Sequence, residues 1–169
     1  MSVQIYTGDG KGKTTAAFGL ALRAAGHDQR VFIGQFMKGR PYGELRAVSA
    51  IPEIEVAQFG WDECIRREDV REFHIRRSVD GLQICGQMAA SGRFSLLILD
   101  EILVAQWFGL VNLDSVVSFI ARHRDQAELV LTGRHAAPEL IDLADLVTDM
   151  ECVKHPFKGG APAREGVEF

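Results

Sequence analysis

A glycine-rich segment near the start of the chain constrains its fold more than any other feature. Residues 7–15 read Thr-Gly-Asp-Gly-Lys-Gly-Lys-Thr-Thr and lie between a short apolar run and an amphipathic stretch. Glycines permit a tight turn whose backbone N–H groups point inward at an anion. The lysine before the threonines adds a compact positive charge, and a threonine hydroxyl suits a phosphate-bound Mg²⁺. The segment therefore predicts a strand, a phosphate-binding loop and a helix, and with them the binding of a nucleoside triphosphate.

The loop departs slightly from the usual phosphate-loop pattern. Thr7 stands where that pattern has its first glycine, and the nearest glycine comes one residue later. The alternative, an ordinary Gly/Asp turn before a helix, is disfavoured by the preceding strand and by the carboxylates further along the chain. The nucleotide-binding residues expected in this segment are Gly8, Asp9, Gly10, Lys11, Gly12, Lys13, Thr14 and Thr15.

Composition excludes several classes of protein. The chain of 169 residues, 47% hydrophobic and 25% charged, is expected to form a single domain over residues 1–169. Its formal charge of −4 gives no support to nucleic-acid binding. The most apolar stretch, residues 94–111, is interrupted by Asp100 and Glu101 and is not expected to span a membrane. Three scattered cysteines and no visible signal peptide favour the cytoplasm.

Short apolar runs alternate with helical patterns, which predicts an α/β fold of three α/β/α layers around a mostly parallel sheet. The expected strands cover residues 3–6, 31–36, 54–57, 94–99, 128–132 and 146–151, and the expected helices cover 14–25, 69–91, 114–122 and 138–143. Asp69 is a candidate cap for the long helix, whose expected buried positions are Val70, Phe73, Val79, Leu82, Cys85 and Met88. Trp107 and Phe108 are also expected in the core.

Ligands of such a sheet bind beyond the carboxyl ends of the strands, where polar residues gather in this chain. Asp100 and Glu101 end an apolar strand and are candidate Mg²⁺ ligands opposite Thr14, either directly or through water. Lys38, Arg40 and Arg134 could pair with phosphate oxygens, and a solvated turn is the alternative for each. Arg23, in the first helix, could face the nucleotide or be exposed. Lys154 and His155 lie in a tail that could fold back over the ligand. Phe59 and Trp61 could line a site for a flat ligand. The residues alone point to an ATP-binding enzyme with a large, partly apolar second substrate.

Taken together, these segments resemble the phosphate-loop family of ATP:cob(I)alamin (corrinoid) adenosyltransferases, which have a P-loop NTPase (RecA-like) architecture. The matching pieces follow the family order along nearly the whole chain, at residues 7–19, 35–39, 42–44, 99–101, 131–134, 144–150, 153–157 and 163–169. The combination of the loop with Val-Lys-His-Pro-Phe at 153–157 is highly specific. The resemblance implies transfer of the 5′-deoxyadenosyl group of ATP to a Co(I) corrinoid with release of triphosphate.

The resemblance also implies roles for particular residues. Lys13, Thr14 and Glu101 would be catalytic, with Mg²⁺ or Mn²⁺ beside the triphosphate, and Arg23, Gln35 and Lys38 match positions near the nucleotide. Residues 59–65 are shorter than the aromatic corrinoid-facing loop of better-known members, which leaves Trp61 as a substitute or indicates another corrinoid. The candidates are cobalamin and cobyrinic acid a,c-diamide, in biosynthesis or salvage of adenosylcobalamin. A homodimer and a flavoprotein reductant are the implied partners, with no nucleic acid and no membrane.

Two other classes of function remain open from the residues. A phosphate-loop ATPase or kinase would cleave ATP at the γ-phosphate and release ADP without a corrinoid. A non-catalytic carrier would bind ATP and corrinoid and convert neither. The nature of the phosphate product, and whether its release needs a corrinoid, distinguishes the three.

Overall fold

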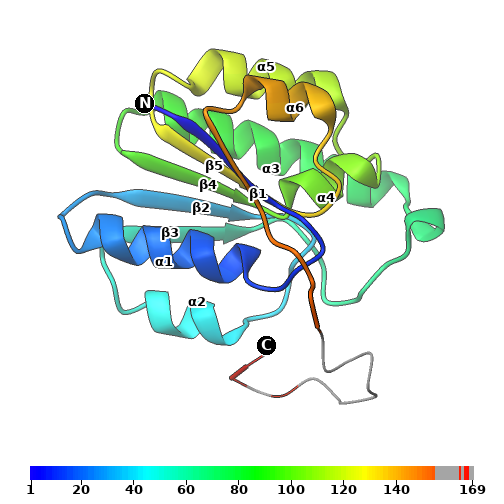
Figure 1. The fold of residues 1–169 in the computed structure, drawn as a ribbon, viewed down its shortest axis with the longest axis horizontal. Coiled ribbons are helices and arrows are strands. Elements are labelled where there is room, and N and C mark those ends of the chain that lie inside the picture. The colour runs from blue at the N-terminus through cyan, green and yellow to red at the C-terminus, as the bar shows by residue number, and fades with distance from the viewer. Residues whose placement is uncertain (155–163, 165, 168–169) are drawn as a thin grey trace.

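A parallel sheet runs through the centre of the molecule (Figure 1). The computed structural model describes residues 1–154, 164, 166 and 167. Within them, six strands pair in the order β3-β2-β4-β5-β1-β6, all parallel. Their bounds are β1 Val3–Thr7, β2 Val31–Gln35, β3 Ile54–Gln58, β4 Leu96–Asp100, β5 Glu128–Thr132 and β6 Leu146–Asp149. Because every strand points the same way, the loops that follow them meet at one edge.

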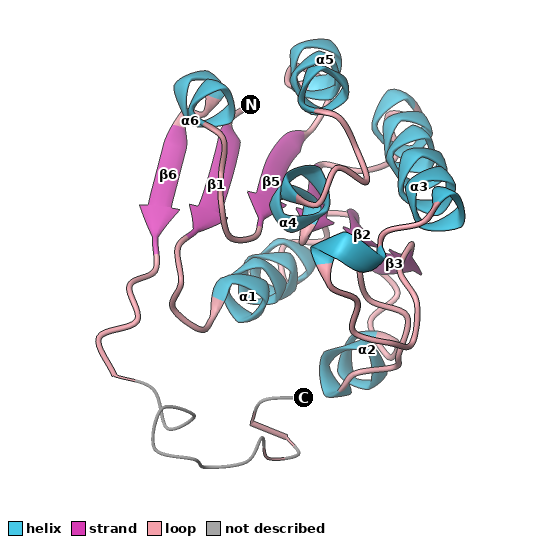
Figure 2. Ribbon diagram, turned by 90° about the vertical axis from the view of Figure 1, so that its right-hand side faces the viewer, coloured by secondary structure: helices cyan, strands magenta, loops and turns pink. Residues whose placement is uncertain are grey.

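Helices cover both faces of the sheet, which gives the three layers expected from the sequence (Figures 1 and 2). On one face lie α1 (Lys13–Ala25) and α2 (Gly43–Val48). The other face carries α3 (Glu72–Ala90), α4 (Ile102–Trp107), α5 (Leu113–His123) and α6 (Pro138–Leu143). A parallel sheet needs such cover because its strands are apolar on both sides.

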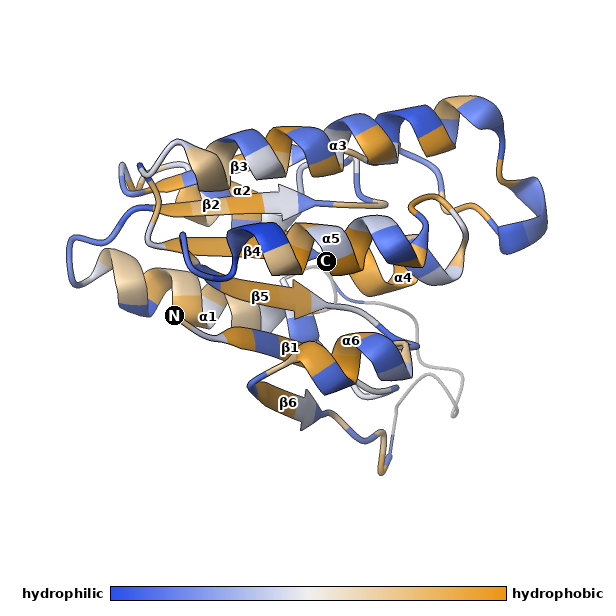
Figure 3. Ribbon diagram, turned by 90° about the horizontal axis from the view of Figure 1, so that it is seen from above, coloured by the Kyte–Doolittle hydropathy of each residue, from blue (hydrophilic) through white to orange (hydrophobic). Residues whose placement is uncertain are grey.

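The central strand β4 shows how the sequence builds two cores. All five of its residues are buried. Leu97 and Leu99 pack into the cluster beneath α3 to α6, whereas Leu96 and Ile98 pack into the cluster beneath α1 and α2. Successive strand residues point to opposite faces, so an unbroken apolar run fills both layers at once. In Figure 3 the strands β4 and β5 accordingly appear largely apolar, whereas α3 and α5 alternate apolar and polar residues.

The long helix α3 differs from the expectation in its start and in its buried face. It begins at Glu72, after a separate 3-10 turn η1 (Arg67–Asp69), so Asp69 is not its cap. The side chain of His74 reaches back instead, and its Nδ1 accepts a hydrogen bond from the N–H of Arg71 at 3.0 Å. This bond satisfies one of the donors that a helix start leaves unpaired.

The expected buried positions of α3 were partly wrong. Leu82 and Cys85 are buried and Val70 and Met88 pack against the core, but Phe73 and Val79 are exposed. The stripe that faces the sheet runs back from Leu82 and Cys85 through small or polar residues, namely Gly81, Ser78 and His74. Their spacing of three and four residues follows the helix period, which places the larger Phe73 and Val79 off that stripe.

Two six-residue helices, α2 and α4, were not expected from the sequence. Trp107 ends α4 and is 38% exposed, which corrects its expected place in the core, while Phe108 packs against the core. The described residues contain no helix of the length and apolar character needed to cross a bilayer.

Candidate active site

Several loops with unusual backbone geometry meet at the carboxyl edge of the sheet. Met37, Glu101 and His135 follow β2, β4 and β5, and each has a left-handed φ of 60° or 61°. Residues with side chains rarely adopt this conformation, which costs energy and is concentrated at functional sites. The geometry of this edge is therefore set by the surrounding fold and is a candidate for ligand binding.

The phosphate loop follows β1 and encloses the side chain of Lys13. The ammonium of Lys13 is buried and donates to the carbonyls of Gly8 at 2.7 Å and Gly10 at 2.6 Å. Gly8 and Gly12 have φ of 95° and 113°, which a side chain would strain. Burial lowers the pKa of Lys13, and the charge of Glu101 opposes that shift. The loop thus holds a cation in its centre, at the start of α1.

The loop also rests directly on the segment that follows β6. The N–H of Gly10 donates to the carbonyl of Met150 at 2.5 Å. A Cβ at Gly8 would lie 2.0 Å from Oδ1 of Asp149, and one at Gly10 would lie 2.4 Å from the Met150 carbonyl. These two positions accept only glycine without movement of the β6 segment. The segment that follows β6 therefore supports the phosphate loop from outside. Lys154 lies further along this segment and is exposed.

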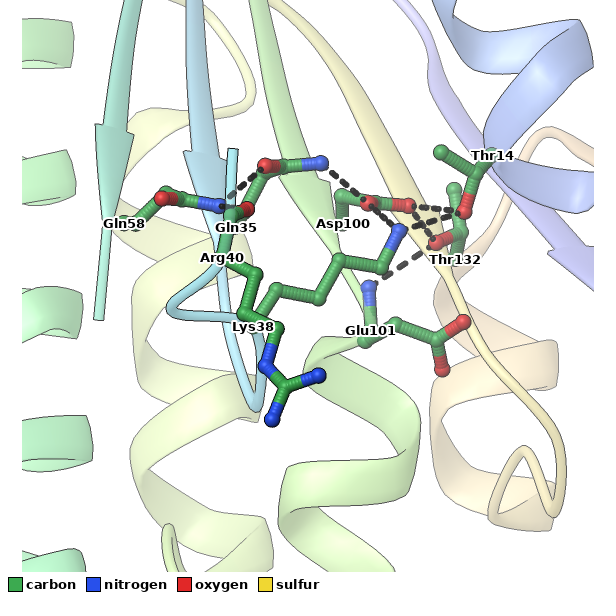
Figure 4. Close-up of polar contacts among 8 residues, drawn as sticks. All are labelled: Thr14, Gln35, Lys38, Arg40, Gln58, Asp100, Glu101 and Thr132. Atoms are coloured by element: carbon green, nitrogen blue, oxygen red, sulfur yellow. Dashed lines mark hydrogen bonds and ion pairs between the residues drawn. The ribbon is translucent and has the colours of Figure 1, made fainter. Parts of the chain in front are cut away.

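Asp100 at the end of β4 is the centre of a hydrogen-bonded cluster that joins four elements (Figure 4). Its side chain is fully buried. Oδ1 accepts hydrogen bonds from the hydroxyls of Thr14 at 2.9 Å and Thr132 at 2.7 Å. Oδ2 accepts from the amide of Gln35 at 3.0 Å and from the ammonium of Lys38 at 2.8 Å. A buried carboxylate needs such partners, and these four hydrogen bonds hold Asp100 in one orientation.

Lys38 also contacts Thr14, with 3.1 Å between Nζ and the hydroxyl oxygen. Burial lowers the pKa of Lys38, but the charge and hydrogen bond of Asp100 outweigh it, so the net shift is upward. Arg40, the second cation of this loop, points its guanidinium away from Asp100 (Figure 4). The structure thus brings Lys38 into the cluster and leaves the guanidinium of Arg40 outside it.

Glu101 lies beside this cluster without joining it through its carboxylate, which points away from Asp100 (Figure 4). Its backbone N–H donates to the hydroxyl of Thr132 at 2.9 Å. Burial, followed by the negative charge of Asp100, raises the pKa of Glu101, while Lys38, Lys13 and Arg134 lower it. Its carboxylate is thus close enough to Lys13, Lys38 and Arg134 to feel their positive charges.

Two members of the cluster were missed by sequence reasoning. Thr132 donates to Asp100 and accepts from Glu101, and Gln58 at the end of β3 donates to Oε1 of Gln35 at 3.1 Å. Both are terminal residues of strands whose next neighbours in the sheet carry Asp100 or Gln35. The available signal was a polar residue at the carboxyl end of each predicted strand.

The remaining residues that the sequence suggested for nucleotide binding lie outside this cluster, in different surroundings. Arg134 borders a pocket of about 1030 Å³ with Gly8 and Asp9, and its guanidinium donates to the Asp9 carbonyl at 3.4 Å. Lys11 and Thr15 are exposed on the outside of the loop, and the Lys11 ammonium donates to the carbonyl of Val167. Arg23 is exposed in the last turn of α1, about 15 Å along the helix from Lys13. His155 lies outside the described residues.

The aromatic residues after β3 have two different environments. Phe59 is buried against Phe36, and a Cβ at Gly81 of α3 would lie 2.4 Å from its ring. The structure thus places Phe59 in the core, whereas Trp61 is partly exposed. The ring of Trp61 packs against His74 with centroids 4.3 Å apart and the ring planes tilted by 43°, and both residues border a pocket of about 450 Å³. Within the described residues, the indole N–H of Trp61 is buried without a hydrogen-bond acceptor.

The residues around Thr14 fit a divalent cation. The Thr14 hydroxyl and the Asp100 carboxylate already hold a positive group, the Lys38 ammonium, between them. Hydroxyl and carboxylate oxygens are the ligands that Mg²⁺ prefers, and Glu101 adds a second carboxylate nearby. A phosphate-cradling loop at a helix start and a strand-end carboxylate facing its threonine define a P-loop nucleotide-binding protein.

Comparison with known proteins narrows this class to one family. The model of the family described as ATP:corrinoid adenosyltransferase BtuR/CobO/CobP matches residues 1–169. The corrinoid adenosyltransferase of Pseudomonas aeruginosa is 37% identical over 98% of this chain and 82% of its own length. Those of a Sinorhizobium species and of Escherichia coli are 34% and 32% identical over 98% of this chain, and over 78% and 84% of their own lengths. The chain belongs to the family of ATP:corrinoid adenosyltransferases.

Proposed function

We propose that this protein transfers the 5′-deoxyadenosyl group of ATP to the Co(I) centre of a corrinoid and releases inorganic triphosphate. The observation that carries the proposal is the family match along the whole chain. The corrinoid cobalt supplies the electron pair that forms the cobalt–carbon bond at C5′. The bond between C5′ and its oxygen breaks, and its electrons leave with the triphosphate. No proton is transferred in this step, so the protein needs no general base.

The work left to the protein is to hold the triphosphate and to stabilise the charge that it gains on leaving. The loop N–H groups at the start of α1 and the enclosed ammonium of Lys13 are suited to this task. Arg134 borders the same loop and can form a bidentate contact with phosphate oxygens. Gln35 and Thr132 act through Asp100, which they orient.

Thr14, Asp100 and Glu101 are the proposed ligands of a Mg²⁺ or Mn²⁺ ion that enters with ATP. When bound, the ion neutralises charge on the phosphate oxygens. The fixed geometry of Asp100 supports this assignment, because a carboxylate with buried partners loses little freedom on binding a cation. Burial and the nearby charge of Asp100 raise the pKa of Glu101, and a bound cation would relieve both effects, which also supports the assignment.

The corrinoid is proposed to approach from the side of Trp61, which offers a large apolar surface beside a pocket at the same edge of the sheet. A homodimer, a flavoprotein reductant and a cytoplasmic location are further proposals, supported by the family likeness. Cobalamin and cobyrinic acid a,c-diamide are the two candidate substrates.

The test is product analysis after anaerobic incubation with Mg-ATP, cob(I)alamin and excess reductant, beside a control without corrinoid. The expected products are triphosphate and a light-sensitive alkylcobalt spectrum, in the complete mixture only. ADP and phosphate in both mixtures would instead identify a phosphate-loop ATPase. ATP binding without any product would identify a carrier.

A further inference from the structure

The ammonium of Lys38 lies between the two groups best suited to ligate the metal. It is 2.8 Å from Oδ2 of Asp100 and 3.1 Å from the hydroxyl oxygen of Thr14 (Figure 4). A divalent ion that bound these oxygens would need nearly the same position. Two cations this close repel strongly at a partly buried site. The ammonium and the metal ion therefore exclude one another.

Lys38 is the partner of Asp100 that can leave. Gln35 and Thr132 are fully buried at the ends of β2 and β5, and Thr14 is fixed in the first turn of α1. The Lys38 side chain is 17% exposed and lies on a loop. Its four-carbon stem allows the ammonium to swing without movement of the sheet.

The backbone beneath Lys38 is held in place, so the motion concerns the side chain alone. The N–H of Gly60 donates to the Lys38 carbonyl at 3.1 Å. A Cβ at Gly60 would lie 2.0 Å from the Lys38 nitrogen, so the two loops are in direct contact. On the outer side, the ring centroid of Tyr42 is 5.8 Å from the ammonium and offers a resting place for a displaced cation.

We propose that Lys38 is a built-in counter-ion that occupies the metal position in the nucleotide-free protein and leaves it when the metal–nucleotide complex enters. The proposal rests on the proposed function in taking Thr14 and Asp100 as the metal ligands. It follows that the metal alone binds weakly, because it must displace a bound ammonium. A polyphosphate changes this balance, since its oxygens offer the displaced ammonium a new partner. Metal binding is thereby coupled to nucleotide binding.

The test measures metal binding without ATP or corrinoid, so it is independent of turnover. Mn²⁺ is titrated into wild-type protein and into Lys38→Met, and the free ion is followed by electron paramagnetic resonance. Removal of the competing ammonium should lower the Kd for Mn²⁺ by about tenfold or more. Arg40→Met is the matched control, because it removes a cation of the same loop that points away from Asp100, and its Kd should stay near the wild-type value.

Thermal unfolding gives a second readout of the same competition. Mn²⁺ alone should raise the Tm of Lys38→Met more than that of wild type, because at a given free concentration a tighter-binding ligand stabilises the folded state more. Lys38→Gln, which keeps a polar head, provides the comparison if Lys38→Met does not fold. An unchanged Kd in the Lys38 variants, or equal tightening in Arg40→Met, would overturn the proposal. Tightening confined to the Lys38 variants supports it even if product analysis were to reject adenosyl transfer.

Discussion

At the scale of single residues, the site contains two consecutive carboxylates in contrasting environments. Asp100 is buried and accepts hydrogen bonds from Thr14, Thr132, Gln35 and Lys38. Glu101 is the next residue, yet its left-handed backbone turns its carboxylate away from that cluster. The Asp100 carboxylate is thus fixed by its hydrogen-bond partners. The Glu101 carboxylate stays outside this cluster, and burial and the charge of Asp100 disfavour its ionised form.

The raised pKa of Glu101 predicts that Glu101→Gln stabilises the nucleotide-free protein at alkaline pH. Burial and the charge of Asp100 raise this pKa above its unfolded value, so the ionised side chain weakens the fold. The favourable contribution of the protonated form exists below the unfolded pKa and is lost as the pH rises through the folded pKa. The Tm of Glu101→Gln should therefore exceed that of wild type at pH 8, and the difference should disappear near pH 4.

Glu128 provides the matched control, because its pKa is shifted in the opposite direction. Burial raises its pKa, but hydrogen bonds from Ser2 and Gln4 outweigh this effect and lower it. Ionised Glu128 therefore stabilises the fold above its unfolded pKa, and this contribution is lost as the pH falls through the folded pKa. Glu128→Gln should lower the Tm at pH 8. A similar loss in Glu101→Gln would contradict the environment described for Glu101.

At the scale of elements, the site could be predicted wherever a motif coincided with a strand end. The phosphate loop, Asp100 and Lys38 were found because each follows a predicted strand, and parallel strands bring such ends to one edge. Thr132 and Gln58 were missed because their roles depend on the strand order β3-β2-β4-β5, which the sequence does not reveal. Local patterns give the strands, but long-range packing decides which strands are neighbours.

Trp61, in the loop that follows β3, is predicted to affect the reaction with Co(II) corrinoid more than the reaction with Co(I) corrinoid. If Trp61 keeps water and the lower axial ligand away from the corrinoid cobalt, Trp61→Ala should slow the reaction with Co(II) corrinoid under mild reductant. It should slow the reaction with chemically prepared Co(I) corrinoid less. We expect an additional loss of about tenfold, which corresponds to ~1.4 kcal/mol in the barrier. The two rates are measured by the appearance of the alkylcobalt spectrum.

Trp107→Ala is the control for this loop. Trp107 is the other tryptophan of the chain and stacks on His135 with centroids 4.2 Å apart, while the Arg67 guanidinium lies 4.9 Å from its ring centroid. Its loss should leave the ratio of the Co(II) and Co(I) rates unchanged. An equal loss of both rates in Trp61→Ala would assign Trp61 a general role in binding or folding.

At the scale of the whole molecule, the fold separates stability from chemistry. The two apolar clusters lie on the faces of the sheet, beneath α1 and α2 and beneath α3 to α6. The charged residues of the site lie at the carboxyl edge, where the strands end and loops carry the polar groups (Figures 2 and 4). The layered architecture was predictable from alternating apolar runs and helical patterns. The tight packing of the phosphate loop on the β6 segment was not, because it joins the two ends of the chain.

The central claim is that ATP is cleaved at C5′ and that the triphosphate leaves intact. The most direct measurement uses ATP that carries ¹⁸O at the oxygen between C5′ and the α-phosphorus, reacted with cob(I)alamin under anaerobic conditions. Attack at C5′ leaves this oxygen on the triphosphate, so mass spectrometry should find the label there and the adenosyl group on cobalt. Labelled ADP with unlabelled phosphate would contradict the account, because it would mean that the loop directs attack to the γ-phosphate.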